Sequence, residues 1–369
     1  MSHRSVRKKK GPKPDWADRH FEQFFDEPSD EFIAAWLAHI KATGRPEMFD
    51  GVSTTKPPRN GRIVLRARKI TVPVKKRDDG YLVPCPICST ECSKFITGYM
   101  AWFPLEGVVR FIGHQCGEKY FDPGKFRQAE KDLKQKLATA ARRKFLEKNI
   151  HLVPDLIDSL EKALPKAQAA SQVNKHCALK HRALWQMLGA QVKDANTLYV
   201  YDQASTVVSS EFGDRFTSRK VAELSGLTAL LMRYEPEKAF RQAINRLKSL
   251  HLEEQDDVGE FLGGLNEKEE EFVESAIRNA SDVLGKERVR LFDFEQFFTS
   301  ENLRALTRWG QDRMAPTRLR ADLRFEGTRT VFCIDWVSER DYLRVELPHS
   351  LFDPIALPPK LIWTDEDNL

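Results

Sequence analysis

The sequence predicts an α+β fold in which a β-rich N-terminal module, a mainly helical middle and a small C-terminal antiparallel sheet follow one another. Two β-like runs joined by turn-forming residues, at 94–103 and 108–112, indicate the N-terminal module. Apolar residues at helical spacing from Phe126 to Phe145 indicate the helical middle. Three further β-like runs indicate the sheet, as a meander over 319–325, 330–337 and 342–347. At 369 residues, the chain is long enough for two or three domains.

The first elements are a basic tail and a short helix. Residues 1–14 carry six Lys/Arg, have no acid and offer nothing to bury, so we expect a disordered tail. Residues 15–60 hold a short helix after Asp30, with Trp36 on its apolar face, and then a linker. The basic start leads into no apolar stretch typical of a signal peptide, and no segment reaches the ~18 apolar residues of a membrane span. These features predict a cytoplasmic or nucleoid-associated protein that is not secreted and has no membrane partner.

Four of the six cysteines lie in the expected β module, residues 61–122. Cys85 and Cys88 form a C-x₂-C pair, Cys92 follows it, and His114 and Cys116 lie beyond the hairpin. A C-x₂-C turn lets two thiolates hold one ion, and a hairpin returns further ligands to it, which is typical of tetrahedral structural Zn²⁺. The local pattern resembles a zinc ribbon or a treble clef. Two alternatives are cysteines that only pack in a core and a redox pair, which needs a helix directly after the motif.

The fourth zinc ligand stays open between two residues. Cys85, Cys88 and Cys116 are the predicted core of the site, and His114, two residues before Cys116, is favoured as the fourth ligand. Cys92 is the alternative and would complete a Cys₄ set. Either set fills a four-ligand shell, so the predicted Zn²⁺ is structural and not catalytic.

The rest of the chain is expected to be mainly helical. Residues 123–190 should form long helices, of which one ends near 164 and the next follows Pro165. Residues 191–369 should form a helical domain that ends in the meander, with a hairpin over 197–208 and helix over 217–251. Asn266 with Glu269 three residues later predicts a capped helix start.

Two weaker motifs lie in this helical part. His176, Cys177 and His181 are close in sequence, but a helix packed in a bundle explains them better than a metal does. Residues 218–235 have the small-residue and glycine spacing of a helix-turn-helix, although an apolar second helix argues against base recognition.

The net charge of +5 hides a strong polarisation along the chain. Residues 51–77 carry nine bases and no acid, and residues 125–148 carry nine bases against three acids. Because Lys and Arg neutralise phosphates, a zinc module flanked by such segments predicts a nucleic-acid partner and favours phosphate contacts over base recognition. The predicted contacts are Arg62, Arg66, Arg68, Lys69, Lys75, Lys76 and Arg110.

Two other function classes stay as alternatives. In a protein-interaction scaffold, the helices or the acidic segment 253–274, with ten acids and one Lys, would contact a partner protein. An enzyme is less favoured, because G-x-x-x-x-G-K-[ST], H-E-x-x-H and G-x-S-x-G are all absent. An unrecognised metal-dependent nuclease would have to use the carboxylates of Asp322, Asp335 and Glu339.

Overall fold

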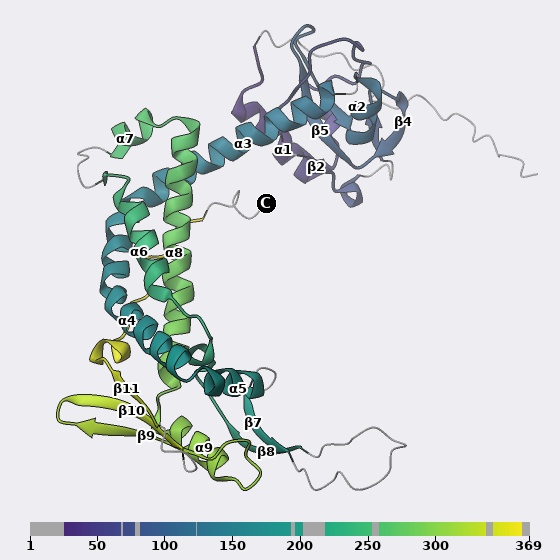
Figure 1. The fold of residues 1–369 in the computed structure, drawn as a ribbon. Helices are drawn as coiled ribbons and strands as arrows, with labels where there is room; N and C mark the ends of the chain where they lie inside the picture. Colours follow the sequence, from purple (N-terminus) through teal and green to yellow (C-terminus); the bar gives the residue numbers. More distant parts are fainter. Residues whose placement is uncertain are drawn as a thin grey trace, which may run out of the picture. The chain divides into compact units, whose positions relative to one another are not determined.

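The computed structural model describes residues 26–67, 69–77, 82–122, 124–192, 196–201, 218–252, 258–336 and 342–363, with the backbone alone at 89–94 and 218. The predicted tail and Arg68 therefore lie outside the described residues. The chain divides into two compact units, Met1–Ala141 and Arg142–Leu369, which we call unit 1 and unit 2. Both contain helices and antiparallel strands (Figure 1), which confirms the α+β prediction. Each described helix is too short or too polar to cross a membrane.

The main sheet of unit 1 is built around one central strand, β5 (Thr97–Phe103). One edge of β5 pairs with β6 (Val108–Gly113), which confirms the predicted hairpin. Its other edge pairs with two short strands in succession, β1 (Val64–Leu65) and β2 (Ile70–Thr71). All pairings are antiparallel, so alternate side chains of β5 face opposite sides of the sheet.

Helices cover both faces of this sheet and create two small cores. Helix α1 (Asp30–Thr43), capped by Ser29 and ended by Gly44, packs Trp36 against Phe111 with the ring centroids 5.4 Å apart. On the opposite face lie α2 (His114–Tyr120) and α3 (Lys125–Asn149). The core on that face contains Cys85, Phe103, Ile112, Phe121 and Phe126. A second hairpin, β3 (Val83–Cys85) and β4 (Ser89–Phe95), adjoins both cores through its side chains.

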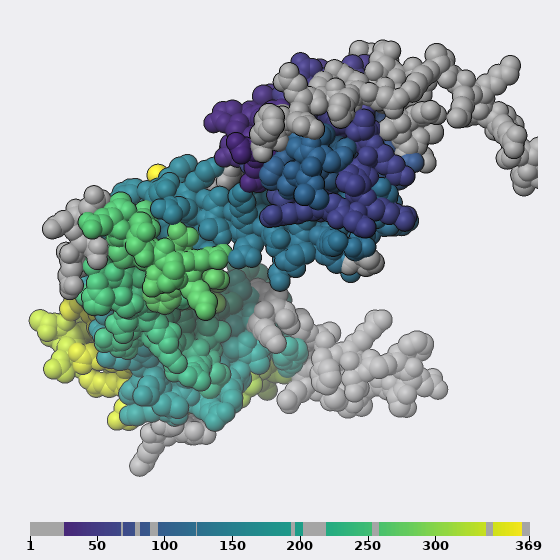
Figure 2. Space-filling model, turned by 90° about the horizontal axis from the view of Figure 1, so that it is seen from above, coloured from purple at the N-terminus to yellow at the C-terminus, as the bar shows by residue number. Residues whose placement is uncertain are grey.

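A single large core holds unit 2 together. Helices α4 (Val153–Lys180), α6 (Pro236–Lys248) and α8 (Glu267–Gln296) lie side by side, and in Figure 2 the teal residues of α4 adjoin the green residues of α6 and α8. The smaller elements are α5 (Arg182–Val192), α7 (Val258–Gly264) and the hairpin of β7 (Thr197–Tyr201) with β8 (Ser218–Glu223). The side chain of Asn149 exchanges hydrogen bonds of 2.9 and 2.6 Å with the backbone of Ile362, which fastens the C-terminal segment to this core.

The C-terminal meander of unit 2 is confirmed. Its strands are β9 (Leu319–Glu326), β10 (Arg329–Trp336) and β11 (Tyr342–Leu347), in the spatial order β11-β10-β9. Helix α9 (Ser300–Gln311) packs beside β9. The predicted capping box of α8 is also confirmed, because the Asn266 and Glu269 side chains each accept a backbone N–H of the other residue.

Two predictions about unit 2 are wrong. Residues 153–180 form one helix with Pro165 inside it, because packing of Leu160 and Ala167 in the core outweighs the one backbone bond that proline removes. Residues 218–223 form strand β8 instead of a helix, and Gly226 then turns with φ of +77°. Any side chain at Gly226 would place Cβ 2.1 Å from the Phe297 nitrogen. The structure therefore contains no helix-turn-helix at the described residues of 218–235.

Candidate metal centre

Three cysteine thiols of unit 1 converge on one point. Cys85 ends β3, Cys88 lies in the β3–β4 turn, and Cys116 lies in the first turn of α2. Their sulfur atoms all lie within 4.8 Å of one another, and the Cys88 and Cys116 sulfurs are 2.6 Å apart. Cys85 is fully buried, Cys116 is half-buried and Cys88 is exposed. None of the described cysteines forms a disulfide, so the three side chains are available as metal ligands.

Glycines let the elements that carry these thiols approach one another closely. Gly113, at the junction of β6 and α2, lies under the ring of Phe95, and a Cβ there would approach that ring to 3.1 Å. Gly117, beside Cys116, lies against the ring of Phe126 on α3, where a Cβ would come within 2.5 Å of a ring carbon. The local sequence therefore places Cys116 by packing α2 tightly against Phe95 of β4 and Phe126 of α3.

The ionisation of the cluster depends on whether a cation is bound. Burial, and then the neighbouring thiol of Cys88, raise the pKa of the Cys116 thiol above its usual value. Grouped thiols in a partly buried place resist ionisation, whereas a divalent cation stabilises the thiolate form and reverses this preference. Three sulfur donors suit Zn²⁺ better than Mg²⁺ or Ca²⁺, which prefer oxygen. The three thiols therefore fit a metal ion.

His114 does not join the three-thiol cluster. Its Nδ1 lies 3.0 Å from the Glu130 carboxylate, and its ring lies near those of Tyr99 and Phe126. The prediction assumed that His114 ends a strand, but α2 begins at this residue. Residues two apart on a helix point in different directions, which separates His114 from Cys116. Cys92 lies on β4, and its side chain is outside the described part of the structure.

Two of the predicted phosphate contacts are occupied inside unit 1. Arg110 is 1% exposed, and its guanidinium donates to the Glu106 carboxylate and to the backbone oxygen of Thr55. The Arg110 guanidinium is therefore engaged inside unit 1 and is not exposed for a phosphate contact. The Arg66 side chain is 10% exposed and binds Glu27 and the carbonyl oxygen of Pro28.

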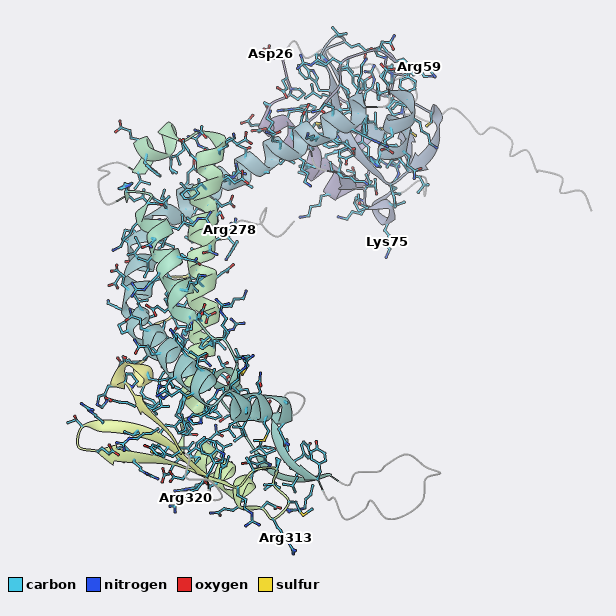
Figure 3. The ribbon with its side chains drawn as sticks, in the orientation of Figure 1. Asp26, Arg59, Lys75, Arg278, Arg313 and Arg320 are labelled. Carbon is cyan, nitrogen blue, oxygen red and sulfur yellow. The ribbon has the colours of Figure 1, made fainter. Side chains whose placement is uncertain are left out.

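The remaining predicted contacts are exposed but do not form one group. Arg62, Lys69, Lys75 and Lys76 are exposed. Lys76 donates to the carbonyl oxygen of Lys41 on α1. Figure 3 shows Arg59, which precedes Arg62, and Lys75 on opposite sides of unit 1 in this view. The basic segment 51–77 therefore supplies positive charge to separate parts of the surface.

Sequence reasoning missed the residue that joins the basic chain to the helix of Cys116. The hydroxyl of Tyr120, one helical turn after Cys116, donates to the Pro57 carbonyl oxygen at 2.7 Å. The Lys56 ammonium and the Arg59 guanidinium lie 5.5 and 5.6 Å from the centroid of the Tyr120 ring. The one available clue in the sequence was that Tyr120 follows Cys116 by four residues. Sequence alone does not connect this tyrosine to a loop 63 residues earlier.

Other candidate residues are engaged in structural contacts. Cys177 is buried, and His181 stacks on Trp336 with centroids 5.2 Å apart. Asp322 and Asp335 both pair with Arg324 on the outer face of the meander, while Glu339 lies outside the described residues. Among the described residues, the three-thiol cluster is the one group whose geometry suits a metal ion. Comparison with protein-family models, curated proteins and solved structures found no match for this chain.

Proposed function

We propose that unit 1 is a structural-zinc module that binds nucleic acid through phosphate contacts. The observation that carries this proposal is the position of α2, which holds the metal ligand Cys116 at one end and the basic loop 56–62 at the other, through Tyr120. Metal binding orders the helix, and the helix orders the loop. The metal thus contributes to binding without touching the nucleic acid.

The zinc part of the proposal is supported by the arrangement of the ligands. Two of them come from a hairpin turn, and the third comes from the first turn of the helix that follows the sheet. This arrangement favours the treble-clef form of the predicted resemblance over the zinc-ribbon form. We propose Cys92 as the fourth ligand, because β4 pairs with β3 next to Cys85 and the Nδ1 atom of His114 lies 3.0 Å from Glu130.

The phosphate part of the proposal is supported by the loop. Lys56, Arg59 and Arg62 are exposed, and no acid occurs between residues 51 and 77. Two prolines, 57 and 58, restrict the backbone between the first two of these bases, so little entropy is lost when they contact phosphates. Exposed cations held in a fixed arrangement release counterions from a nucleic acid but recognise no sequence.

A pair of charge-matched variants tests the phosphate contacts. In Lys56→Ala/Arg59→Ala/Arg62→Ala, the affinity for single-stranded or duplex nucleic acid should fall at all sequences alike. The slope of log K against log salt should flatten by about 0.9 per lost phosphate contact on duplex. The control, Lys69→Ala/Lys75→Ala/Lys76→Ala, removes the same charge and should have the smaller effect. Equal losses in both variants, or no salt-sensitive binding by the zinc-loaded chain, would contradict the proposal.

A second pair of variants tests the ligand set. Cys92→Ser should weaken zinc retention more than His114→Ala does, because serine is a poor zinc ligand and His114 lies outside the thiol cluster. The measurement is the zinc content per chain after competition with a chelator. The opposite ranking would restore His114 as the fourth ligand.

A further inference from the structure

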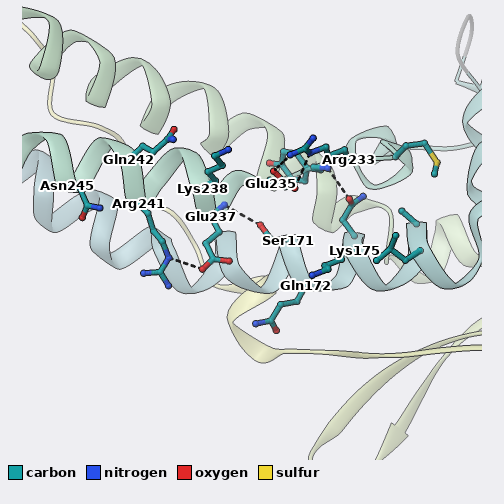
Figure 4. A pocket seen from close by; sticks show the side chains of 15 residues that line it. Ser171, Gln172, Lys175, Arg233, Glu235, Glu237, Lys238, Arg241, Gln242 and Asn245 are labelled. Atoms are coloured by element: carbon teal, nitrogen blue, oxygen red, sulfur yellow. Dashed lines mark hydrogen bonds and ion pairs between the residues drawn. The ribbon is translucent and has the colours of Figure 1, made fainter.

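A groove in unit 2 lies between α4 and α6. Its volume is about 730 Å³, and Figure 4 shows the lining side chains of Gln172 and Lys175 on α4 and of Lys238 and Gln242 on α6. The groove follows α4 from Ser171 to Leu179, which is about 12 Å of helix. We call it the α4–α6 groove.

The walls of the α4–α6 groove are held in place by buried hydrogen bonds. Asn174 on α4 is buried, accepts the N–H of Tyr234, and donates to the carbonyl oxygens of Ala229 and Leu231. The Ser171 hydroxyl oxygen accepts the N–H of Glu237 in the first turn of α6. The segment that connects the walls is thus fixed to α4, and the groove is formed before any ligand binds.

The groove carries a net positive charge. Four bases and two acids line it, and each acid pairs with a base: Arg233 with Glu235 at 3.0 Å, and Arg241 with Glu237 at 2.8 Å. Lys175 and Lys238 remain on the two walls. Both favour the ionised form of Glu235, although the hydrogen bond from Arg233 is the main reason for its lowered pKa. Two lysines on opposite walls therefore attract negative charge to the groove.

One end of the groove is apolar. Leu179 is 68% exposed and Met232 is 38% exposed. Met232 also lines an adjoining hollow of about 390 Å³, between α5 and the segment 227–232, whose walls include Trp185 and Leu227. The groove thus continues from a basic half into an apolar half.

We infer that the α4–α6 groove docks a short acidic segment of a partner protein, with carboxylates over Lys175 and Lys238 and an apolar side chain in the hollow at Met232. Charge complementarity selects an acidic ligand. A small anion fits less well, because the lysines are exposed and the groove extends along two turns of helix and into a second hollow. A peptide with separate acidic and apolar anchors matches both halves.

Selection of a random peptide library against the full-length zinc-loaded chain tests this inference. The enriched peptides should contain Asp or Glu together with Leu, Ile or Phe. For a synthetic copy of the strongest binder, Lys175→Glu/Lys238→Glu should raise the Kd about tenfold or more. Met232→Ser should also raise the Kd, whereas it should leave the salt dependence unchanged.

The control variant is Lys268→Glu/Lys286→Glu, which makes the same charge change on exposed residues of α8. It should leave the Kd within about twofold. Enrichment of non-acidic peptides, failure to enrich any peptide, or equal effects of the two lysine pairs would overturn the inference. Concentration-dependent dimerisation that Lys175→Glu/Lys238→Glu abolishes would also overturn it, because the occupant would then be a second copy of the chain. Nucleic-acid binding by unit 1 is not involved in any of these outcomes.

Discussion

The two units of this chain use different means to stabilise their folds. Unit 2 joins α4, α6, α8 and the meander around one continuous apolar core. Among the described residues of unit 1, the buried side chains form two cores, of eleven and nine residues, on opposite faces of its main sheet. Small separate cores contribute little stability, and folds of this kind commonly add a metal or a disulfide.

The thiol cluster lies at a junction of unit 1 that a bound metal would stabilise. It joins the β3–β4 hairpin to α2, and two-stranded hairpins are marginally stable in water. In unit 2, buried amide side chains connect separate segments: Asn174 bonds to the backbone of residues 229 and 231, and Asn302 bonds to the backbone of Ser225 and Gln296. Polar groups therefore hold elements together in both units: three thiols that fit a metal ion converge in unit 1, and amide side chains make buried hydrogen bonds in unit 2.

Removal of the metal should have the largest effect and should act on one unit. Structural Zn²⁺ contributes about 10–16 kcal/mol in zinc-finger peptides, as much as the whole stability of a small domain. A chelator, or Cys85→Ser, should therefore abolish amide protection in β5 and β6 while α4 and α8 keep theirs. Hydrogen exchange read by mass spectrometry measures both units in one sample.

The control for this prediction is Cys333→Ala, which removes a buried thiol of unit 2. It should leave the zinc content at one ion per chain. If the amides of β5 and β6 stay protected from hydrogen exchange in metal-free protein, unit 1 does not depend on a metal and the proposed difference between the units is contradicted.

Arg77→Met should cause the second-largest effect, confined to unit 1. The Arg77 side chain is fully buried, and its guanidinium binds both oxygens of the Glu47 carboxylate at 2.7 and 3.2 Å. Loss of the cation leaves a buried carboxylate unpaired, which costs about 3–5 kcal/mol of unfolding free energy. The measurement is the urea midpoint of unit 1, which is read from the hydrogen exchange of its peptides at increasing urea concentration. The double variant Arg77→Met/Glu47→Leu should recover much of the loss, and the same loss in both variants would contradict this explanation.

Asn302→Ala should destabilise unit 2 by a smaller amount. The Asn302 side chain accepts hydrogen bonds from the N–H and hydroxyl of Ser225 and donates to the Ser225 and Gln296 carbonyl oxygens. Its loss leaves buried backbone groups unpaired, at a cost of about 2–3 kcal/mol. Thermal unfolding of zinc-loaded protein measures the change. Asn245→Ala, at an exposed position of α6, should be nearly neutral, and an equal effect there would exclude the hydrogen bonds as the cause.

Much of the fold followed from local sequence patterns. The β5–β6 hairpin, the capped start of α8 and the C-terminal meander were predicted because turn residues, capping residues and apolar periodicity act over short distances. Strands β1 and β2 were beyond prediction, since two residues carry no period. Strand β8 was mistaken for a helix because its partner β7 is distant in sequence, and pairing outweighed propensity.

The sequence was enough to predict which cysteines converge at the candidate site, but not how the neighbouring residues are arranged around them. The C-x₂-C pair and Cys116 pointed to one ion, and the three thiols do converge. The place of His114 depended on whether β6 continues or α2 begins there, a difference of one or two residues that sequence patterns do not resolve. The burial of Arg110 could not be foreseen either, because it depends on Glu106 across a tight turn and on Thr55 from a distant loop.

The bond pair between Asn149 and Ile362 has a consequence for synthesis on the ribosome. Unit 1 is complete once residue 141 has emerged, and all of its converging thiols come from the first 116 residues. Unit 2 joins residues that lie 213 positions apart in the chain, so this contact forms only after position 362 has been synthesised. Nascent chains therefore present a finished first unit together with an open, apolar second one, which is the state that chaperones recognise.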